Sequence, residues 1–203
     1  MKALILVDIQ NDFIPGGALA VQEGDMVVPV ANKLQEKFEL IVATQDWHPQ
    51  DHGSFAANNP GKNIGDIIDL NGLDQIMWPV HCVQNSAGAE FHPQLNTKKI
   101  SKVFPKGTDK SIDSYSGFYD NGHRKATGLA EFLKKHQVDE VFVCGLATDY
   151  CVKFTVLDAL KEGFKTTLVS DGCRGVNLNT DDSQKAIEEM RKSGCNIINS
   201  SDI

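Results

Sequence analysis

The sequence predicts an α/β protein built as a three-layer α/β/α sandwich with a mainly parallel central sheet. Two observations favour this fold class. Short apolar runs alternate with amphipathic segments along the chain, an order typical of a parallel sheet with right-handed crossovers. The first apolar run, residues 3–9, carries no polar residue except Asp8 near its end, as expected for a strand covered on both faces.

The remaining elements are expected to alternate along the chain. Helices are predicted over residues 25–38, 128–136 and 180–192, and another begins near Cys151. Strands are predicted over residues 40–44, 100–104, 141–145, 166–169 and 196–198. The last helix has Asp181 and Asp182 in its first turn and Arg191 and Lys192 at its end, charges that suit the helix dipole.

Residues 45–122 interrupt this alternation. Pro, Gly, Asn and Asp are frequent there and regular periodicity is weak. Long irregular segments inside compact domains are usually functional, so we expect part of the site in this stretch. There is no internal repeat, low-complexity tract or linker, and residues 1–203 are therefore interpreted as one domain.

Composition limits the classes of function. With 203 residues and 41% hydrophobic content, the chain can bury a proper core. Its net charge of −7 argues against a nucleic-acid surface, which depends on clustered Lys and Arg, and so small molecules are the expected partners. No apolar run is long enough to span a membrane and no signal peptide is recognised, so no membrane partner and a cytoplasmic location are expected. The five cysteines form no CxxC pair, which favours reduced thiols. A homo-oligomer remains open.

Cys151 is the first candidate for a catalytic residue. The strand over residues 141–145 stops at a glycine, and the segment that follows delivers Cys151 into the first turn of a helix, with Thr148 as the expected cap. Unpaired amides and the helix dipole favour an anion there, so the thiol pKa is expected to fall below its free value of about 8.5. The alternative is that Cys151 is only a small buried apolar residue.

The turn after the first strand argues against a dinucleotide site, a common use of Rossmann-like sheets. It lacks the G-x-G-x-x-G pattern and reads D-I-Q-N-D-F-I-P-G-G, which is acidic where a pyrophosphate would need backbone amides. Ligands of open α/β sheets bind beyond the carboxyl ends of the strands. This rule predicts that Asp8, Asp46 and Cys151 share one edge of the sheet.

A second set of residues has the composition of a metal site. Asp46 and His48 alternate in an extended segment and can point the same way, and His81 is a candidate third ligand. Two imidazoles and one carboxylate suit Zn, Fe or Mn and leave positions open for water or substrate. The alternative is a loop aspartate with two surface histidines. His52 is an extra ligand or, as we favour, a surface loop residue, and His92, His123 and His136 are expected to be solvated.

Asp8 and Lys106 are candidate partners of the thiol. A carboxylate at the end of a buried strand has a raised pKa unless it meets a cation, which makes Asp8 a candidate proton carrier. Lys106 follows the predicted strand over residues 100–104 among apolar neighbours and could pair with Asp8. A thiol, a carboxylate and a lysine suit acyl transfer through a thioester. The alternative for Asp8 is a carboxylate that only caps a loop.

These motifs coincide from end to end with a known family. The chain resembles the nicotinamidases of the isochorismatase-like cysteine hydrolase superfamily. The motifs that carry the resemblance are L-I-L-V-D-I-Q-N-D-F around Asp8, Q-D-W-H-P around Asp46, W-P-V-H-C around His81, F-P-K-G around Lys106 and G-L-A-T-D-Y-C-V around Cys151.

The resemblance implies the isochorismatase-like hydrolase fold and a role for each matching residue. A catalytic triad is implied at Asp8, Lys106 and Cys151, and a divalent transition metal, zinc before iron or manganese, at Asp46, His48 and His81. A substrate pocket is implied at the aromatic residues Phe13, Trp78 and Tyr115 and at Ala147. A cis peptide bond between Leu146 and Ala147 and an oxyanion hole formed by the amides of Ala147 and Cys151 are implied as well.

The implied activity is hydrolysis of nicotinamide, a linear amide, to nicotinate and ammonia in NAD salvage, with pyrazinamide also admitted. Isochorismatases lack this cysteine and carbamoyl-cleaving amidases generally lack this metal site, so the two features together favour a nicotinamidase. The alternatives are another metal-assisted cysteine amidase, a protein that binds a metal or small molecule without turnover, and a redox sensor that uses Cys151.

Overall fold

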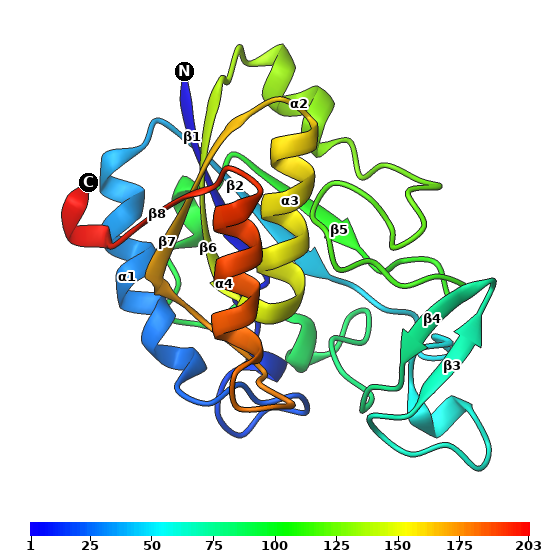
Figure 1. Cartoon of the computed structure of the whole chain (residues 1–203). Helices are drawn as coiled ribbons and strands as arrows, with labels where there is room; N and C mark the ends of the chain where they lie inside the picture. Colours follow the sequence, from blue (N-terminus) through cyan, green and yellow to red (C-terminus); the bar gives the residue numbers. More distant parts are fainter.

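The central element of the fold is a six-stranded, wholly parallel sheet. The computed structural model describes residues 1–203, and the strand order is β5-β2-β1-β6-β7-β8 (Figure 1). The sheet strands are β1 (Lys2–Val7), β2 (Leu40–Asp46), β5 (Lys102–Lys106), β6 (Glu140–Leu146), β7 (Lys165–Arg174) and β8 (Asn196–Ile198). The predicted mainly parallel sheet is confirmed.

Four helices cover the sheet. They are α1 (Val27–Leu34), α2 (Leu129–Lys135), α3 (Lys153–Lys161) and α4 (Asp182–Lys192). Helices α3 and α4 lie side by side in front of the sheet in Figure 1 and pack against each other. The connection from β1 to β2 runs in the opposite direction to those from β5 to β6, from β6 to β7 and from β7 to β8, and right-handed connections therefore place α1 on the other face. The result is the predicted three-layer sandwich.

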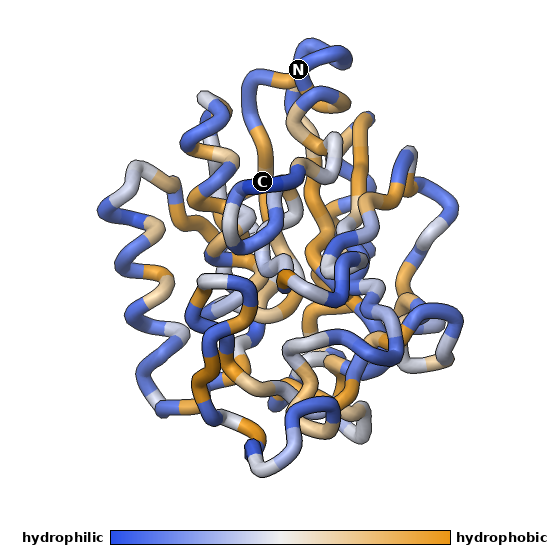
Figure 2. The backbone as a smooth tube through the Cα atoms, turned by 90° about the vertical axis from the view of Figure 1, so that its right-hand side faces the viewer, coloured by the Kyte–Doolittle hydropathy of each residue, from blue (hydrophilic) through white to orange (hydrophobic).

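The core lies on both faces of the inner strands. Strands β1, β2 and β6 are buried along almost their whole length, which explains their continuous apolar sequence. Figure 2 shows the same distribution, with hydrophobic inner strands and largely hydrophilic outer turns and helix faces. No helix in the structure is both long enough and apolar enough to cross a membrane. The five cysteines are all buried and unpaired.

One glycine allows the two central strands to approach. Gly145 in β6 has a φ of +128°, and a Cβ atom there would lie 2.1 Å from the carbonyl oxygen of Val7 in β1. No side chain fits in that space, so the glycine that stops the predicted strand is required by its neighbour in the sheet.

Several predicted boundaries were wrong. The helix expected over residues 25–38 is α-helical only over Val27–Leu34, because its two ends are tighter 3₁₀ turns. Strand β7 runs well beyond the predicted residues 166–169 and reaches Arg174. The irregular segment contains an unpredicted antiparallel hairpin of β3 (Ile67–Leu70) and β4 (Leu73–Ile76), whose short strands alternate only weakly.

Candidate active site

The carboxyl ends of four adjacent strands meet at one edge of the sheet. Asp8 follows β1, Asp46 ends β2 and Lys106 ends β5, where it is the register partner of Asp46. Cys151 lies in the turn between β6 and α3. The reactive atoms of Asp8, Asp46 and Cys151 lie within 4.8 Å of one another, so the predicted shared edge is confirmed.

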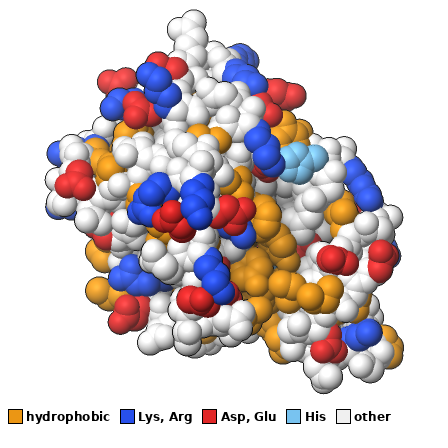
Figure 3. Space-filling view, viewed as in Figure 1, with side chains coloured by type: hydrophobic (Ala, Val, Ile, Leu, Met, Phe, Trp, Pro, Cys, Tyr) orange, Lys and Arg blue, Asp and Glu red, His pale blue; other side chains and the backbone are white.

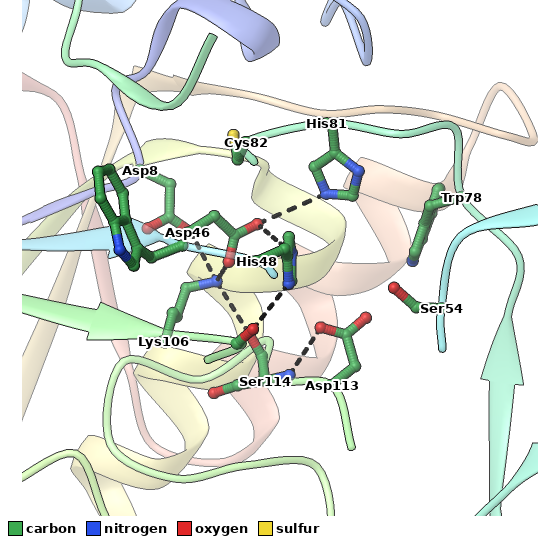
Figure 4. A network of polar contacts seen from close by, with 12 residues as sticks. Asp8, Asp46, His48, Ser54, Trp78, His81, Cys82, Lys106, Asp113 and Ser114 are labelled. Atoms are coloured by element: carbon green, nitrogen blue, oxygen red, sulfur yellow. Dashed lines mark hydrogen bonds and ion pairs between the residues drawn. The ribbon is translucent and has the colours of Figure 1, made fainter. Parts of the chain in front are cut away.

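Lys106 lies at the centre of this group. Its Nζ atom is 2.9 Å from Oδ2 of Asp8 and 3.3 Å from Sγ of Cys151. It also donates to the carbonyl oxygen of Ser114 at 2.9 Å and forms an ion pair with Oδ1 of Asp46 (Figure 4). The predicted pairing of Asp8 with Lys106 is therefore present, and Asp8 does not merely cap a loop.

Burial and mutual charge set the protonation of this cluster. Burial and the nearby Asp46 raise the pKa of Asp8, although Lys106 opposes the shift. Burial alone would also raise the pKa of Asp46, but Lys106 and His48 hold it well below its usual range. Burial would lower the pKa of Lys106, yet the two carboxylates raise it well above its ordinary value. Lys106 therefore stays a cation, and Asp8 is the carboxylate better suited to carry a proton.

Cys151 lies in a different local structure from the one predicted. Residues Thr148–Val152 form a π-helical turn, Ala147 is its N-cap, and no side chain caps it, so the predicted Thr148 cap is wrong. Burial raises the pKa of the Cys151 thiol well above its ordinary value, although Lys106 lowers it in part. The expected fall in the thiol pKa is therefore also wrong, because the desolvation of the thiolate raises the pKa more than the end of the helix lowers it. The thiol needs a proton acceptor, and Asp8 is within reach.

The three predicted metal ligands also converge. Oδ2 of Asp46 lies 3.4 Å from Nε2 of His48 and 3.7 Å from Nε2 of His81, and all three side chains are buried (Figure 4). The interpretation of these histidines as surface residues is therefore wrong.

The hydrogen bonds of the two imidazoles fit a metal. Nδ1 of His48 bonds to the carbonyl oxygen of Gly107 at 2.9 Å, and Nδ1 of His81 bonds to that of Pro79 at 2.8 Å. Each Nδ1 must carry the hydrogen, because a carbonyl only accepts. Both Nε2 atoms therefore face the carboxylate of Asp46, and in the neutral rings each offers a lone pair, so the set suits a divalent transition metal with its supporting outer contacts.

His52 is completely buried, and the surface position that we favoured for it is wrong. Its Nδ1 bonds to Oγ of Ser54 at 2.7 Å, and its ring centroid lies 4.4 Å from that of His48. The remaining histidines differ less from expectation, since His123 and His136 are exposed and His92 is half-buried.

A small cavity of about 30 Å³ joins the thiol to the candidate metal ligands. The predicted pocket residues Phe13, Trp78, Tyr115 and Ala147 all line it, together with Asp46, His48, His81 and Cys151. The Leu146–Ala147 peptide bond is cis, as expected. Nε1 of Trp78 donates to the hydroxyl of Tyr115 at 3.1 Å, which fixes one aromatic wall against another.

Sequence reasoning missed four residues that line the same cavity: Leu19, Asp113, Tyr150 and Val176. Tyr150 lies inside the recognised motif around Cys151, and Asp113 comes two residues before Tyr115, so both positions were an available signal. Leu19 and Val176 come from loops with no such signal.

Figure 3 shows apolar side chains gathered in a hollow between the α3–α4 side of the molecule and the β3–β4 hairpin. Apolar and aromatic residues that line a groove on this side of the molecule are Ile76, Tyr115, Tyr150 and Phe154.

The arrangement has the parts of an amide-cleaving site. Cys151, Lys106 and Asp8 form one cluster, and it adjoins the candidate metal ligands, because Asp46 also pairs with Lys106. Aromatic residues line the same cavity, so a flat substrate held at the candidate ligands would present its substituent to the thiol.

Comparison with known proteins agrees with this geometry. The family model described as the isochorismatase domain matches residues 2–202. A nicotinamidase of Escherichia coli (strain K12) is 54% identical over 200 residues, covering 97% of this chain and 93% of the relative. The structure of a nicotinamidase and pyrazinamidase of Acinetobacter baumanii is 46% identical, with a TM-score of 0.96 and coverage of 99% of this chain and 97% of the other. The structure of a Pyrococcus horikoshii pyrazinamidase in complex with zinc is 40% identical, with a TM-score of 0.80 and coverage of 98% of both chains. The chain therefore belongs to the isochorismatase family.

Proposed function

We propose that this protein is an amidohydrolase that converts nicotinamide to nicotinate and ammonia. The observation that carries the proposal is that Cys151, in contact with Lys106 and close to Asp8, lines one cavity with the three candidate metal ligands, in a chain 54% identical to a nicotinamidase. This reaction belongs to NAD salvage. The same cavity would accept pyrazinamide, which has the same flat shape and carboxamide.

Substrate binding depends on two sets of residues, the candidate metal ligands and the aromatic residues of the cavity. Asp46, His48 and His81 would hold a divalent metal, for which zinc is the first candidate because the related P. horikoshii pyrazinamidase binds it. When bound, this ion supplies a Lewis-acidic contact for the ring nitrogen of the substrate. Phe13 and Trp78 would flank the ring and direct the carboxamide carbon toward Sγ of Cys151.

Acylation begins with proton transfer from Cys151 to Asp8. The thiolate attacks the carboxamide carbon and forms the carbon–sulfur bond, while Lys106 stabilises the negative charge beside it. The oxyanion of the tetrahedral intermediate would lie against the amides of Ala147 and Cys151, donors whose loss typically costs about 3 to 4 kcal/mol each. The carbon–nitrogen bond then breaks, and the amine leaves as ammonia with the proton from Asp8.

Deacylation returns the enzyme to its starting state. Asp8, again a carboxylate, takes a proton from a water molecule as that water attacks the thioester carbon. The carbon–sulfur bond breaks, nicotinate is released, and the proton on Asp8 returns to the sulfur of Cys151. Atoms balance, since one water and one amide give one acid and one ammonia.

Ammonia release from a panel of amides tests this function. We expect turnover of nicotinamide and pyrazinamide, little with an aliphatic amide of similar size, and loss of turnover on chelation with recovery when zinc returns. Cys151→Ala should remove turnover but still bind nicotinamide. Ammonia release by Cys151→Ala would refute the nucleophile, and full activity of rigorously metal-free protein would refute the metal. If the metal-loaded wild type bound nicotinamide but released no ammonia, the result would favour the alternative that this chain is a binding protein without catalytic activity.

A further inference from the structure

The side chain of Gln10 makes an unusual pair of contacts. Gln10 is completely buried and lies two residues after Asp8. Its Nε2 donates to the carbonyl oxygen of Asp46 at 2.8 Å, and its Oε1 accepts from the amide nitrogen of the same residue at 2.8 Å. Both backbone polar groups of a candidate metal ligand are thus bonded to one side chain.

The end of the β-ladder explains why Asp46 needs this partner. The register between β1 and β2 ends at Leu6 and Ala43, and the chain turns away at Asp8, which has a φ of +47°. Asp46 therefore has no backbone neighbour on the β1 side, although it still pairs with Lys106 of β5 on the other. A buried backbone donor and acceptor must be bonded, and a primary amide offers one group of each kind. The Gln10 amide takes the place of the missing strand.

The position of Asp46 matters to both halves of the site. Its Oδ1 pairs with Lys106, the cation beside the Cys151 thiol, while its Oδ2 faces Nε2 of His48 and of His81. A rotation or shift of the Asp46 backbone would therefore move a ligand of the metal and a partner of the triad lysine together.

We propose that Gln10 is a positioning residue that holds Asp46 in register for both the metal and the triad. This inference rests on the proposed amidase function for its catalytic part, whereas its metal-binding part does not. Gln10 also donates to the carbonyl oxygen of Ala89 at 2.9 Å, a contact that any test must separate from the two bonds to Asp46.

Gln45 provides the matched control. Its Nε2 donates to the same Ala89 oxygen at 2.9 Å, and it precedes Asp46 in the chain, but its side chain makes no bond to the Asp46 backbone. Gln10→Met keeps the length of the side chain and removes both bonds to Asp46. Gln10→Glu keeps the shape and the acceptor, and its ionised form has no donor. Gln45→Met removes only the contact with Ala89.

The experiment measures zinc affinity by competition with a chromophoric chelator, and then kcat and KM for nicotinamide at saturating zinc. Outer contacts to metal ligands typically contribute about 10- to 100-fold to affinity or activity. We expect Gln10→Met and Gln10→Glu to weaken zinc binding at least tenfold and to lower kcat at saturating zinc at least tenfold, with a smaller change in KM. Gln45→Met should keep zinc affinity, kcat and KM within about twofold of the wild type, because the Gln45 side chain makes no bond to a candidate metal ligand.

Two results would overturn the proposal: zinc affinity and kcat of both Gln10 variants within twofold of the wild type, or equal losses in Gln10→Met and Gln45→Met. Thermal unfolding of the metal-free proteins checks that each variant folds, and Gln10→Glu, which is isosteric, keeps the test available should Gln10→Met not fold. If the wild type released no ammonia but the Gln10 variants still lost zinc affinity, the proposed activity would fail while the positioning of Asp46 would stand.

Discussion

The Nζ atom of Lys106 lies 2.9 Å from Oδ2 of Asp8, and the side chains of both residues are completely inaccessible to solvent. A buried ion pair does not by itself make a protein more stable, because desolvation offsets the attraction. The removal of one partner, however, leaves the other charge without compensation. Here one ammonium faces two carboxylates, since Asp46 also pairs with Lys106, so the lysine is the residue on which the whole cluster depends.

Replacement of the cation should therefore destabilise the fold as well as stop catalysis. Lys106→Met is expected to lower the free energy of unfolding by about 3 to 5 kcal/mol at neutral pH, the usual effect of breaking a buried pair. Lys106 holds the pKa of Asp46 below the ordinary 3.8, so this contribution is present above that pH and is lost as the pH falls through the lowered value. Urea denaturation at several pH values measures the difference.

The control for this substitution is an exposed ion pair of similar length. Lys110 Nζ lies 2.8 Å from Oδ2 of Asp51, and both side chains are largely exposed. Lys110→Met should change the free energy of unfolding far less than Lys106→Met, because solvent screens the exposed pair. Equal effects of the two substitutions would contradict the assignment of Lys106 as the centre of the buried cluster.

The thiol of the free protein should react slowly at neutral pH. Burial raises the pKa of Cys151 well above its ordinary value, so the neutral thiol predominates there. The rate of alkylation by iodoacetamide should rise with pH and should still be increasing at pH 9.0, because only the thiolate is nucleophilic. Mass spectrometry of the wild type and Cys151→Ser locates the modified residue. A rate that reaches its plateau below pH 7 would instead support the activated thiolate predicted from the helix end.

Gly107 should be necessary for metal binding. It has a φ of +63°, and a Cβ atom there would lie 2.3 Å from Cε1 of His48, so Gly107→Ala should displace that ligand. Gly61 has a φ of +80° with nothing within 4 Å, and Gly61→Ala therefore introduces the backbone strain without the contact. Zinc titration should show a loss of at least about tenfold in affinity for Gly107→Ala and little change for Gly61→Ala. Retention of wild-type affinity by Gly107→Ala would argue against His48 as a ligand.

The hydroxyl of Tyr115 should stabilise the aromatic wall of the cavity. It accepts from Nε1 of Trp78 at 3.1 Å and from Nε2 of Gln75 at 3.2 Å. Tyr115→Phe leaves the buried Trp78 donor without a partner, which should cost about 1 to 3 kcal/mol and raise KM for nicotinamide. In Tyr115→Phe/Trp78→Phe that donor is gone. The double variant should therefore lose less free energy of unfolding than the two single variants together. Strict additivity in urea denaturation would mean that the hydrogen bond contributes nothing.

A control for the change in KM is available outside the cavity. The hydroxyl of Tyr119 donates to Oε1 of Glu162 at 2.5 Å. Tyr119→Phe also removes a tyrosine hydroxyl and its hydrogen bond, yet Tyr119 does not line the cavity, so KM for nicotinamide should not change.

Much of the fold was predictable because its signals are local. Apolar runs such as residues 3–9 have few stable places other than a strand covered on both faces, and their alternation with helices limits the connections to right-handed crossovers. The ends of elements were less predictable. Helix α1 and strand β7 depart from their predicted bounds, since their last residues depend on packing against other segments. The β3–β4 hairpin had no clear periodicity to reveal it.

The candidate site divides in the same way. Residue types and motifs were sufficient to nominate Asp8, Lys106 and Cys151, and the rule for strand ends placed two of them at one edge. The positions of Lys106, His81 and Trp78 relative to that edge depended on the long irregular segment, whose path no local pattern describes. Gln10 and Asp113 were overlooked for this reason, because their importance lies only in the partners that the fold brings to them.

The sequence by itself determined the fold class, the family resemblance and the six candidate side chains of the triad and the metal site, since these depend on residue type and order along the chain. Only the tertiary structure decided their environment. It buried His52, replaced the expected helix cap with a π-helical turn, and raised rather than lowered the pKa of Cys151. The physical reason is that desolvation and charge pairing depend on neighbours distant in sequence, and those neighbours meet only when the strands of the sheet come together.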